Sequence, residues 1–563
     1  MSQTSIICVE EAIKDLFDNE LDYNKILKSY SGDIKTGAVS LFQRLFVEFL
    51  HFDWVSGTSG GIAESLPVGE WSERARLKDA NIIAEKDNFK VVYITLEKLT
   101  RTAQRYAISS LTSKGWAMKG EFLAVFHAPQ SKVWHLVSPH ISEGAPILRR
   151  FVVGEGEQHR TVSENLAKMD AELSMPLFER VEDAFQLKTV TNEFYNEYKD
   201  VFGRIKEHLL SKGVGIRDAK KFSHLLLNRL MFIYFIQKKG WINDNKNFIG
   251  WYLDKYKDSD EGEVFHKKWL NELFFSAMSK KPSEKNINTG FGKEVCEVLN
   301  NIPFLNGGLF ERDDDVDKSD IKLPDKLMFE ILDDFLEKYN FTVTEESPFD
   351  VDVAIDPAML GRIYEALIAE EERGKAGIFY TPRVEVNLMC RLAIFEFLSN
   401  KAKDPDDAYK RKIIDFLFTP IVDWQGSEHD DFRKLMDALQ SVKVVDPACG
   451  SGAFLIGMMQ VLKELYRKLD IEPDYELKND IIHKNLYGVD IKDWAVRMAE
   501  FRLWLAIIEE EVDIPEKEPV LPNFTFKLKS DDSIVQKIGD KFIRLEDIKA
   551  ELYGELKDEL KKP

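Results

Sequence analysis

The stretch that decides the fold is Val444-Val-Asp-Pro-Ala-Cys-Gly-Ser-Gly-Ala-Phe454. It begins on apolar residues typical of a buried strand, passes through a glycine-containing turn and opens a helix over residues 455–469. Gly450 and Gly452 allow the backbone to turn tightly and to approach a ligand without an intervening Cβ. Asp446 ends the strand, where its carboxylate can accept hydrogen bonds from a cationic amine. Because open α/β sheets bind ligands beyond the carboxyl ends of their strands, we expect a ligand site here.

A second strand of the same kind is predicted at Leu486-Tyr-Gly-Val-Asp490, and another helix follows it. Strands that alternate with helices in this way indicate a parallel, doubly wound sheet. A carboxylate at the end of the second strand can bond both hydroxyls of a ribose. Taken alone, Asp490 also fits a helix cap, but its spacing from the first turn favours the ribose.

A nucleotide phosphate is the rival ligand for the glycine turn. The spacings Gly-x-x-x-x-Gly-Lys-Ser/Thr and Gly-x-Gly-x-x-Gly are both absent, and Asp446 would repel a phosphate. A cationic ligand such as S-adenosylmethionine fits this turn better.

The composition limits the class of protein. The chain has 563 residues and a formal net charge of −20, and its length predicts about three or four domains. This acidic balance does not suggest a protein that coats nucleic acid by bulk charge, so any DNA contact needs a local patch or another chain. Four scattered cysteines form no Cys-x-x-Cys pair, and no apolar run is long enough to span a membrane. A reducing cytoplasm, without membrane contact, is the expected location.

The periodicity changes twice along the chain. Residues 1–180 show strand-like runs at 89–95, 122–126 and 133–137, which predict an α/β domain whose last two strands form a hairpin. Residues 181–350 are predicted to form a helical connector, and residues 351–563 carry the strand and helix alternation. The fold class is therefore predicted to be multidomain α/β.

Two motifs together resemble a known family. Asp446-Pro-Ala-Cys-Gly-Ser-Gly-Ala-Phe454 and the upstream Gly377-Ile-Phe-Tyr-Thr-Pro382 are similar to the S-adenosylmethionine motifs of γ-type N6-adenine DNA methyltransferases. The resemblance implies a Rossmann-like domain that binds S-adenosylmethionine, double-stranded DNA as the substrate, and an adenine-binding role for Asp532. The cofactor-binding residues that it implies are Tyr380, Thr381, Pro382, Asp446, Ala448, Gly450, Gly452, Phe454, Asp490, Ile491 and Asp532.

The similarity extends upstream of these motifs. Three stretches, residues 228–241, 302–310 and 356–365, resemble type IIG restriction–modification proteins, in which a helical connector joins an N-terminal nuclease domain to the methyltransferase.

One motif of that family is missing. The Asn/Asp-Pro-Pro-Tyr/Phe motif holds the flipped adenine, and this sequence contains neither an Asn-Pro nor a Pro-Pro pair. We therefore expect no catalytic residue in this chain, which ends soon after a third motif, the stretch from residue 521 to residue 533 that contains Asp532. A split enzyme completed by a second protein chain, a truncated gene and a module that has lost catalysis all fit. The split enzyme is the preferred interpretation, since the cofactor motifs are intact.

The N-terminal domain is expected to be nuclease-like, with doubtful activity. A metal-dependent nuclease needs an Asp and then Glu-x-Lys on a strand, and the nearest candidates are Glu70, Asp79, Glu97 and Lys98. Glu97 and Lys98 are adjacent, so on a strand they point to opposite faces. We predict no metal site, and Mg²⁺ is expected only if this domain is an active nuclease.

The sequence therefore predicts the cofactor half of an adenine-specific DNA methyltransferase from a restriction–modification or phage-defence system. The alternative is a non-catalytic subunit of a defence complex, which either binds S-adenosylmethionine or has a purely structural role.

Overall fold

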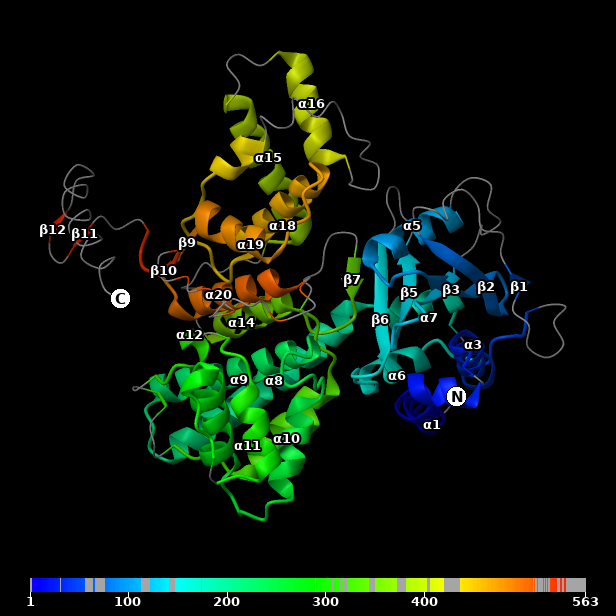
Figure 1. Ribbon diagram of the computed structural model, residues 1–563, viewed down its shortest axis with the longest axis horizontal. Coiled ribbons are helices and arrows are strands. Elements are labelled where there is room, and N and C mark those ends of the chain that lie inside the picture. Colours follow the sequence, from blue (N-terminus) through cyan, green and yellow to red (C-terminus); the bar gives the residue numbers. More distant parts are fainter. Residues whose placement is uncertain are drawn as a thin grey trace.

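The computed structural model describes most of the chain. The described residues are 3–30, 32–55, 64–65, 76–112, 122–140, 147–173, 175–288, 290–305, 307–313, 316–317, 321–343, 350–371, 381–401, 406–419, 436–509, 511, 514, 520, 522, 524, 527–533, 537–538 and 541–542. Within them the fold is mixed α/β, as predicted (Figure 1).

In the N-terminal part, the described strands form one sheet in sequence order. Its strands are β1 (Glu64–Ser65), β2 (Leu77–Lys86), β3 (Phe89–Leu96), β4 (Phe122–His127), β5 (Val133–His140), β6 (Ile147–Gly154) and β7 (Asp350–Asp352). The β3–β4 and β6–β7 pairs are parallel and the others are antiparallel. Helix α5 (Arg101–Thr112) lies between β3 and β4 in the chain and provides the crossover that a parallel pair requires. The three predicted strands and the β4–β5 hairpin are confirmed.

Strand β7 joins this sheet from far along the chain. It runs beside β6 in Figure 1, with Arg150 opposite Asp352 in the register. The Asp352 carboxylate accepts hydrogen bonds from Arg150 at 3.0 Å and from Arg101 at 2.6 Å. The chain that leaves the helical region therefore first returns to the N-terminal sheet and only then enters the part that carries the glycine turn.

The residues between these two parts, for which a helical connector was predicted, are largely helical. Its longer helices are α8 (Leu187–Ser211), α9 (Ile216–Lys238) and α10 (Phe248–Lys257), with α11 (Lys293–Asn301) beside α10 in Figure 1. The C-terminal half of α9 is buried on nearly all sides, because helices surround it. Phe232 and Phe235 of α9 pack edge-on against Phe501, with ring centroids 5.5 and 5.8 Å away. The connector therefore shares its apolar core with the helix that carries Phe501.

The C-terminal part contains the predicted parallel sheet. Strands β8 (Val444–Asp446), β9 (Leu486–Asp490) and β10 (Leu528–Ser530) are parallel in the order β10-β9-β8. Helices α18 (Ala453–Lys468) and α20 (Asp493–Ile508) follow β8 and β9. Helices α14 (Pro357–Glu371), α15 (Arg383–Lys401) and α16 (Asp407–Phe418) precede the sheet in sequence.

Among the described residues, no helix is both long and apolar enough to cross a membrane.

Candidate cofactor site

The glycine turn lies at the carboxyl edge of the parallel sheet, between β8 and α18. Gly450 and Gly452 adopt φ angles of 51° and 84°, in the left-handed region that favours glycine. The Cys449 amide donates to the carbonyl of Val489 on β9 at 2.9 Å, and the Gly452 amide donates to the Cys449 carbonyl at 2.8 Å. A Cβ on Gly452 would lie 2.9 Å from the Cβ of Ala499 on α20. The turn is therefore held tightly against β9 and α20.

Asp490, at the end of β9, contacts the same turn. Its Oδ2 atom accepts a hydrogen bond from the Gly450 amide at 2.9 Å, and its Oδ1 atom accepts one from the Lys492 amide at 2.9 Å. The two motifs that the sequence places about forty residues apart thus meet at one edge of the sheet. Each carboxylate oxygen has a second lone pair, so Asp490 can still accept bonds from ligand hydroxyls.

Asp446, at the end of β8, is half-buried and incompletely satisfied. Its Oδ1 atom accepts a hydrogen bond from the Ala448 amide at 3.2 Å, whereas its buried Oδ2 atom has no donor among the described residues. Burial raises the pKa of this carboxyl, and the negative charge of Asp490 raises it further, although the bond from Ala448 opposes the shift. A buried acceptor without a donor is uncommon in folded proteins and indicates a missing partner. A cationic group would be such a partner.

The third strand places Asp532 at the same edge. Ser530 lies opposite Asp490 in the register, and the Asp531 amide donates to the Asp490 carbonyl at 2.9 Å. Asp532 is exposed just beyond β10, and its own amide donates to the Asp531 carboxylate. Sequence reasoning did not predict β10 as a strand, because its apolar run is too short.

Only part of the upstream cofactor motif, residues 377–382, lies among the described residues. Tyr380 lies outside the described residues, while Thr381 is half-buried and Pro382 is exposed, directly before α15. Arg383 binds the buried Asp356 at 2.9 Å, and Asp356 also accepts the Met359 amide near the start of α14. This contact fixes the start of α15 to the start of α14.

The remaining candidates lie around the turn with different degrees of exposure. Ala448 is exposed, Phe454 is half-buried in the first turn of α18, and 67% of Ile491 is exposed. The structure thus gathers Asp446, the two glycines and Asp490 closely, with the other described candidates at the periphery.

A group of side chains behind the turn was not predicted from the sequence. Ser451, only 2% exposed, donates from its Oγ atom to Glu365 Oε1 of α14 at 2.7 Å. Arg502 of α20 donates to the Ser451 carbonyl at 2.8 Å and lies 3.2 Å from its hydroxyl. Gly361 and Glu365 stand four residues apart on α14, a spacing that puts both on one helix face, and this was the signal available in the sequence.

The described acidic nuclease candidates, Asp79 and Glu97, each lie near a basic side chain. Asp79 on β2 accepts hydrogen bonds from Asn81 and Thr95 and pairs with Lys35 at 3.1 Å. Glu97 follows β3 and is 3.9 Å from Arg76, while Glu70 lies outside the described residues. In the described part of the chain, no group of three His, Cys, Asp or Glu side chains is arranged to hold a metal ion.

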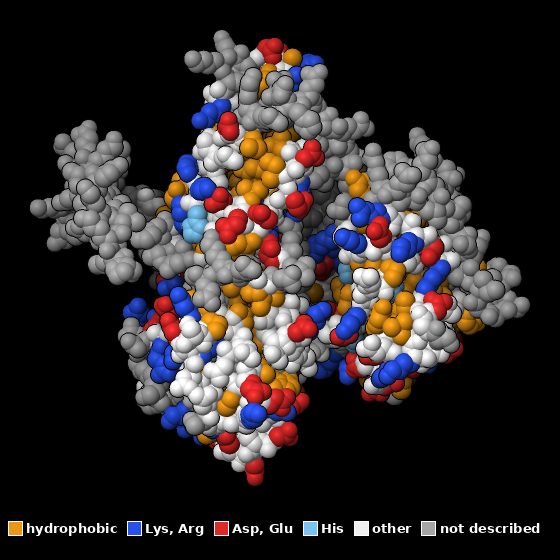
Figure 2. Space-filling model, in the orientation of Figure 1, with side chains coloured by type: hydrophobic (Ala, Val, Ile, Leu, Met, Phe, Trp, Pro, Cys, Tyr) orange, Lys and Arg blue, Asp and Glu red, His pale blue; other side chains and the backbone are white. Residues whose placement is uncertain are grey.

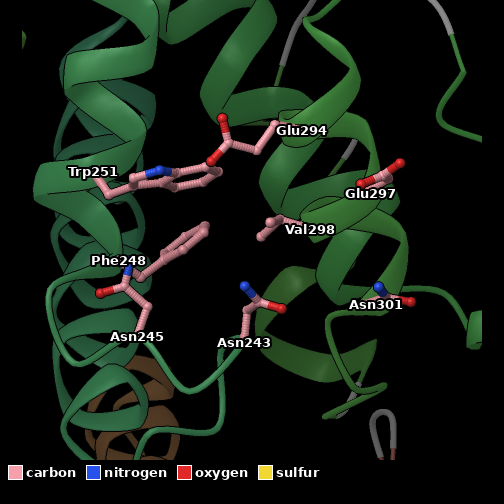
Figure 3. Close-up of a pocket in the computed structure, with 8 residues that line it drawn as sticks. All are labelled: Asn243, Asn245, Phe248, Trp251, Glu294, Glu297, Val298 and Asn301. Atoms are coloured by element: carbon pink, nitrogen blue, oxygen red, sulfur yellow. The ribbon is translucent and has the colours of Figure 1, made fainter.

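A pocket of about 280 Å³ lies elsewhere, between α10 and α11 of the connector (Figure 3). The Trp251 ring lies above the Phe248 ring on one wall in this view, with Glu294 above Trp251 and Asn243 on the lower side of the pocket. Lys255 already reaches this wall, 2.7 Å from Glu294 and 5.9 Å from the Trp251 ring. The pocket is remote in the fold from the ends of the parallel strands, so we do not assign it to the cofactor.

Comparison with known proteins defines the class. Residues 422–539 match the family model described as the DNA-methyltransferase domain of MmeI. Over 395 residues the chain is 31% identical to a protein of Methanocaldococcus jannaschii named as a type II restriction enzyme and methyltransferase, covering 63% of this chain and 33% of that protein. It is 32% identical over 389 residues to the type II restriction enzyme and methyltransferase RM.Eco57I of Escherichia coli, covering 64% of this chain and 33% of that protein.

A shorter match is to a methyltransferase whose name states its target base. Over 72 residues the chain is 32% identical to the adenine-specific methyltransferase BrxX of Escherichia coli O9:H4 (strain HS), covering 13% of this chain and 6% of that protein. The chain spans about a third of the length of the two type II relatives.

These matches show that the chain is similar to DNA methyltransferases of restriction systems. More specifically, the chain is related to fusions of a type II restriction enzyme with a methyltransferase, and its residues 422–539 match the MmeI methyltransferase-domain model. The resemblance stated from the motifs is confirmed, and methyltransferases of this family imply S-adenosylmethionine as the cofactor.

Proposed function

We propose that this chain carries the cofactor-binding part of an adenine-specific DNA methyltransferase in a restriction–modification or phage-defence system. The reaction is transfer of a methyl group from S-adenosylmethionine to N6 of adenine in double-stranded DNA. Residues 351–563 form the methyltransferase part in this proposal, residues 181–350 the connector, and residues 1–180 a nuclease-like domain.

The single observation that carries the proposal is the contact between the glycine turn and the carboxylate at the end of β9. The Gly450 amide bonds Asp490, while the buried Asp446 Oδ2 atom, at the end of the neighbouring strand, has no donor among the described residues. A turn of glycines with a carboxylate on each side suits a ligand that combines a cationic amine with ribose hydroxyls. S-adenosylmethionine has both, and when bound it supplies an electrophilic methyl group on its sulfonium.

Each proposed residue has a defined task. Asp446 would accept hydrogen bonds from the amine, and Asp490 would bond the ribose hydroxyls. Gly450 and Gly452 let the backbone approach the ligand closely. By resemblance, Thr381 with Tyr380 would lie beside the methionine end, and Asp532 beside the adenine.

The side chains that grip the target base are proposed to come from outside these 563 residues. The sequence holds no Asn-Pro or Pro-Pro pair, so the motif that stacks a flipped adenine is absent from it. On the face shown in Figure 2, Lys and Arg side chains are interspersed with Asp and Glu, so this face offers no extended basic surface for DNA. We propose that base gripping and target recognition belong to a second chain or to further sequence.

The first test is calorimetric titration of the purified chain with S-adenosylmethionine. We expect weak, saturable binding that Asp446→Ala reduces at least tenfold, because the amine loses a charge-assisted hydrogen bond. Absence of binding by the wild type would overturn the cofactor role and would favour the purely structural subunit.

A further inference from the structure

We propose that Glu365 on α14 is a further residue of the cofactor site, with its carboxylate facing the positively charged methionine end of S-adenosylmethionine. This inference rests on the proposed function. The role follows from the position of the side chain against the glycine turn and from its unsatisfied oxygen.

The carboxylate lies directly against the turn. Its Oε1 atom accepts the hydroxyl of Ser451 at 2.7 Å, and a Cβ built on Gly450 would lie 3.8 Å from the same oxygen. Glu365 therefore reaches the two central residues of the turn, although it is more than 80 residues away in sequence.

The packing of α14 holds the carboxylate in this place. A Cβ on Gly361, one helical turn before Glu365, would lie 2.7 Å from the Ser451 hydroxyl, so the helix can approach this closely only with glycine there. From the other side, Arg502 of α20 donates to the Ser451 carbonyl at 2.8 Å. Both sides of Ser451 are thus occupied by helices that are fixed relative to the turn.

The second carboxylate oxygen of Glu365 indicates that this residue binds a ligand and does not only support Ser451. Glu365 Oε2 is buried and has no hydrogen-bond donor among the described residues, as is also true of Asp446 Oδ2. A carboxylate that only supported Ser451 would leave this oxygen unsatisfied at a cost in stability. Two incomplete carboxylates next to one turn, with Asp490 as a third, favour a ligand that carries positive charge. The methionine end of S-adenosylmethionine carries both an ammonium and a sulfonium.

The test is a calorimetric titration of the whole chain, as wild type and as Glu365→Gln, with three ligands. S-adenosylmethionine has both cations, S-adenosylhomocysteine lacks the sulfonium, and 5′-methylthioadenosine lacks both. Glutamine keeps an oxygen that can accept the Ser451 hydroxyl, so the substitution removes the charge and retains the support. We expect S-adenosylmethionine to bind about tenfold more weakly and methylthioadenosine to be unchanged. An equal loss for S-adenosylhomocysteine identifies the ammonium as the partner, and no loss identifies the sulfonium.

Unchanged affinity for S-adenosylmethionine, or an equal loss for all three ligands, would overturn the inference, since the residue would then be only a support. Glu396→Gln, on the exposed side of α15, removes the same charge away from the turn and should bind all three ligands as the wild type does. Should Glu365→Gln melt early, Glu365→Asp provides a second variant, with the same selective loss expected. A wild type that binds no S-adenosylmethionine would instead overturn the proposed function itself.

Discussion

At the scale of single residues, Asp446 combines a cost to stability with a function. Burial and the neighbouring Asp490 raise its pKa, so the charged carboxylate is less stable in the folded, unliganded protein than it would be in water. Binding residues are commonly kept in such strained surroundings, because the ligand supplies the missing partner. A substitution of Asp446 should therefore change the stability of the unliganded protein and its affinity for the ligand in opposite directions.

We expect Asp446→Asn to raise the melting temperature of the unliganded protein at neutral pH, because it removes a half-buried charge. The same change should weaken S-adenosylmethionine binding about tenfold, by loss of a charge-assisted hydrogen bond. Differential scanning fluorimetry and calorimetry measure the two effects. Asp437→Asn, at an exposed position seven residues before the start of β8, is the matched control and should change neither.

The raised pKa of Asp446 also predicts a pH dependence. Affinity for a cationic ligand should fall as the pH is lowered and the carboxyl gains a proton, with a midpoint above the usual 3.8. In the unliganded protein the sign is reversed, since stability contributed by the neutral carboxyl is lost as the pH rises through the raised pKa. Titrations across the acidic range would detect the first effect, and a flat affinity profile would contradict it.

Gly452 shows how the turn depends on the absence of a side chain. With φ at 84° and Ala499 Cβ only 2.9 Å from an added Cβ, Gly452→Ala should destabilise the protein by about 2 kcal/mol. Chemical denaturation provides the measurement. Gly203→Ala, in the middle of α8 with nothing within 4 Å of the added Cβ, should instead stabilise it by about 0.8 kcal/mol. Equal effects of the two changes would refute this account.

At the scale of elements, the attachment of β7 depends on charge. Burial alone would raise the pKa of Asp352, but Arg101 and Arg150 outweigh it and hold the pKa below its usual value. The Asp352 carboxylate therefore makes its full contribution to stability above the ordinary carboxyl pKa. This contribution is lost as the pH falls through the lowered pKa of Asp352. These ion pairs join the short strand β7 to β6 through Arg150 and to α5 through Arg101, in addition to the backbone ladder.

Asp352→Asn should reduce the free energy of unfolding by about 3 kcal/mol, because it leaves a buried arginine without its counter-charge. Hydrogen exchange along β6 and β7 should rise at the same time. Asp333→Asn removes the partner of Lys257 in an exposed ion pair and should cost less than about 1 kcal/mol. A smaller loss for Asp352→Asn than for Asp333→Asn would show that β7 is held by other contacts.

The elements also show what sequence could predict. Apolar runs and a glycine turn were enough to place β3, β4, β8 and β9, since local patterning determines them. Strand β7 could not be predicted, because its three residues have no apolar pattern and their partner strand β6 lies about 200 residues earlier in the chain. Glu365 could not be predicted as a site residue either, because its hydrogen bond with Ser451 forms only when α14 and the turn pack together. Contacts between distant segments decided both of these features.

At the scale of the whole molecule, the net charge of −20 and the family relationship can both hold if DNA is read elsewhere. We predict that the purified chain alone methylates no adenine in duplex DNA, because the base-gripping motif is absent. Addition of a polypeptide with that motif and a recognition domain should restore methylation, measured by transfer of labelled methyl groups. Robust methylation by the chain alone would contradict the prediction, and Asp446→Ala controls for the cofactor site.

The pairing of β7 with β6 has a consequence for biosynthesis. The partners Arg150 and Asp352 are 202 residues apart, so a growing chain exposes the edge of β6 long before its neighbour exists. At about 5–20 residues per second, translation of that interval takes roughly 10–40 s. The N-terminal sheet therefore emerges from the ribosome with an open edge, and the helical connector must be synthesised before that edge can close.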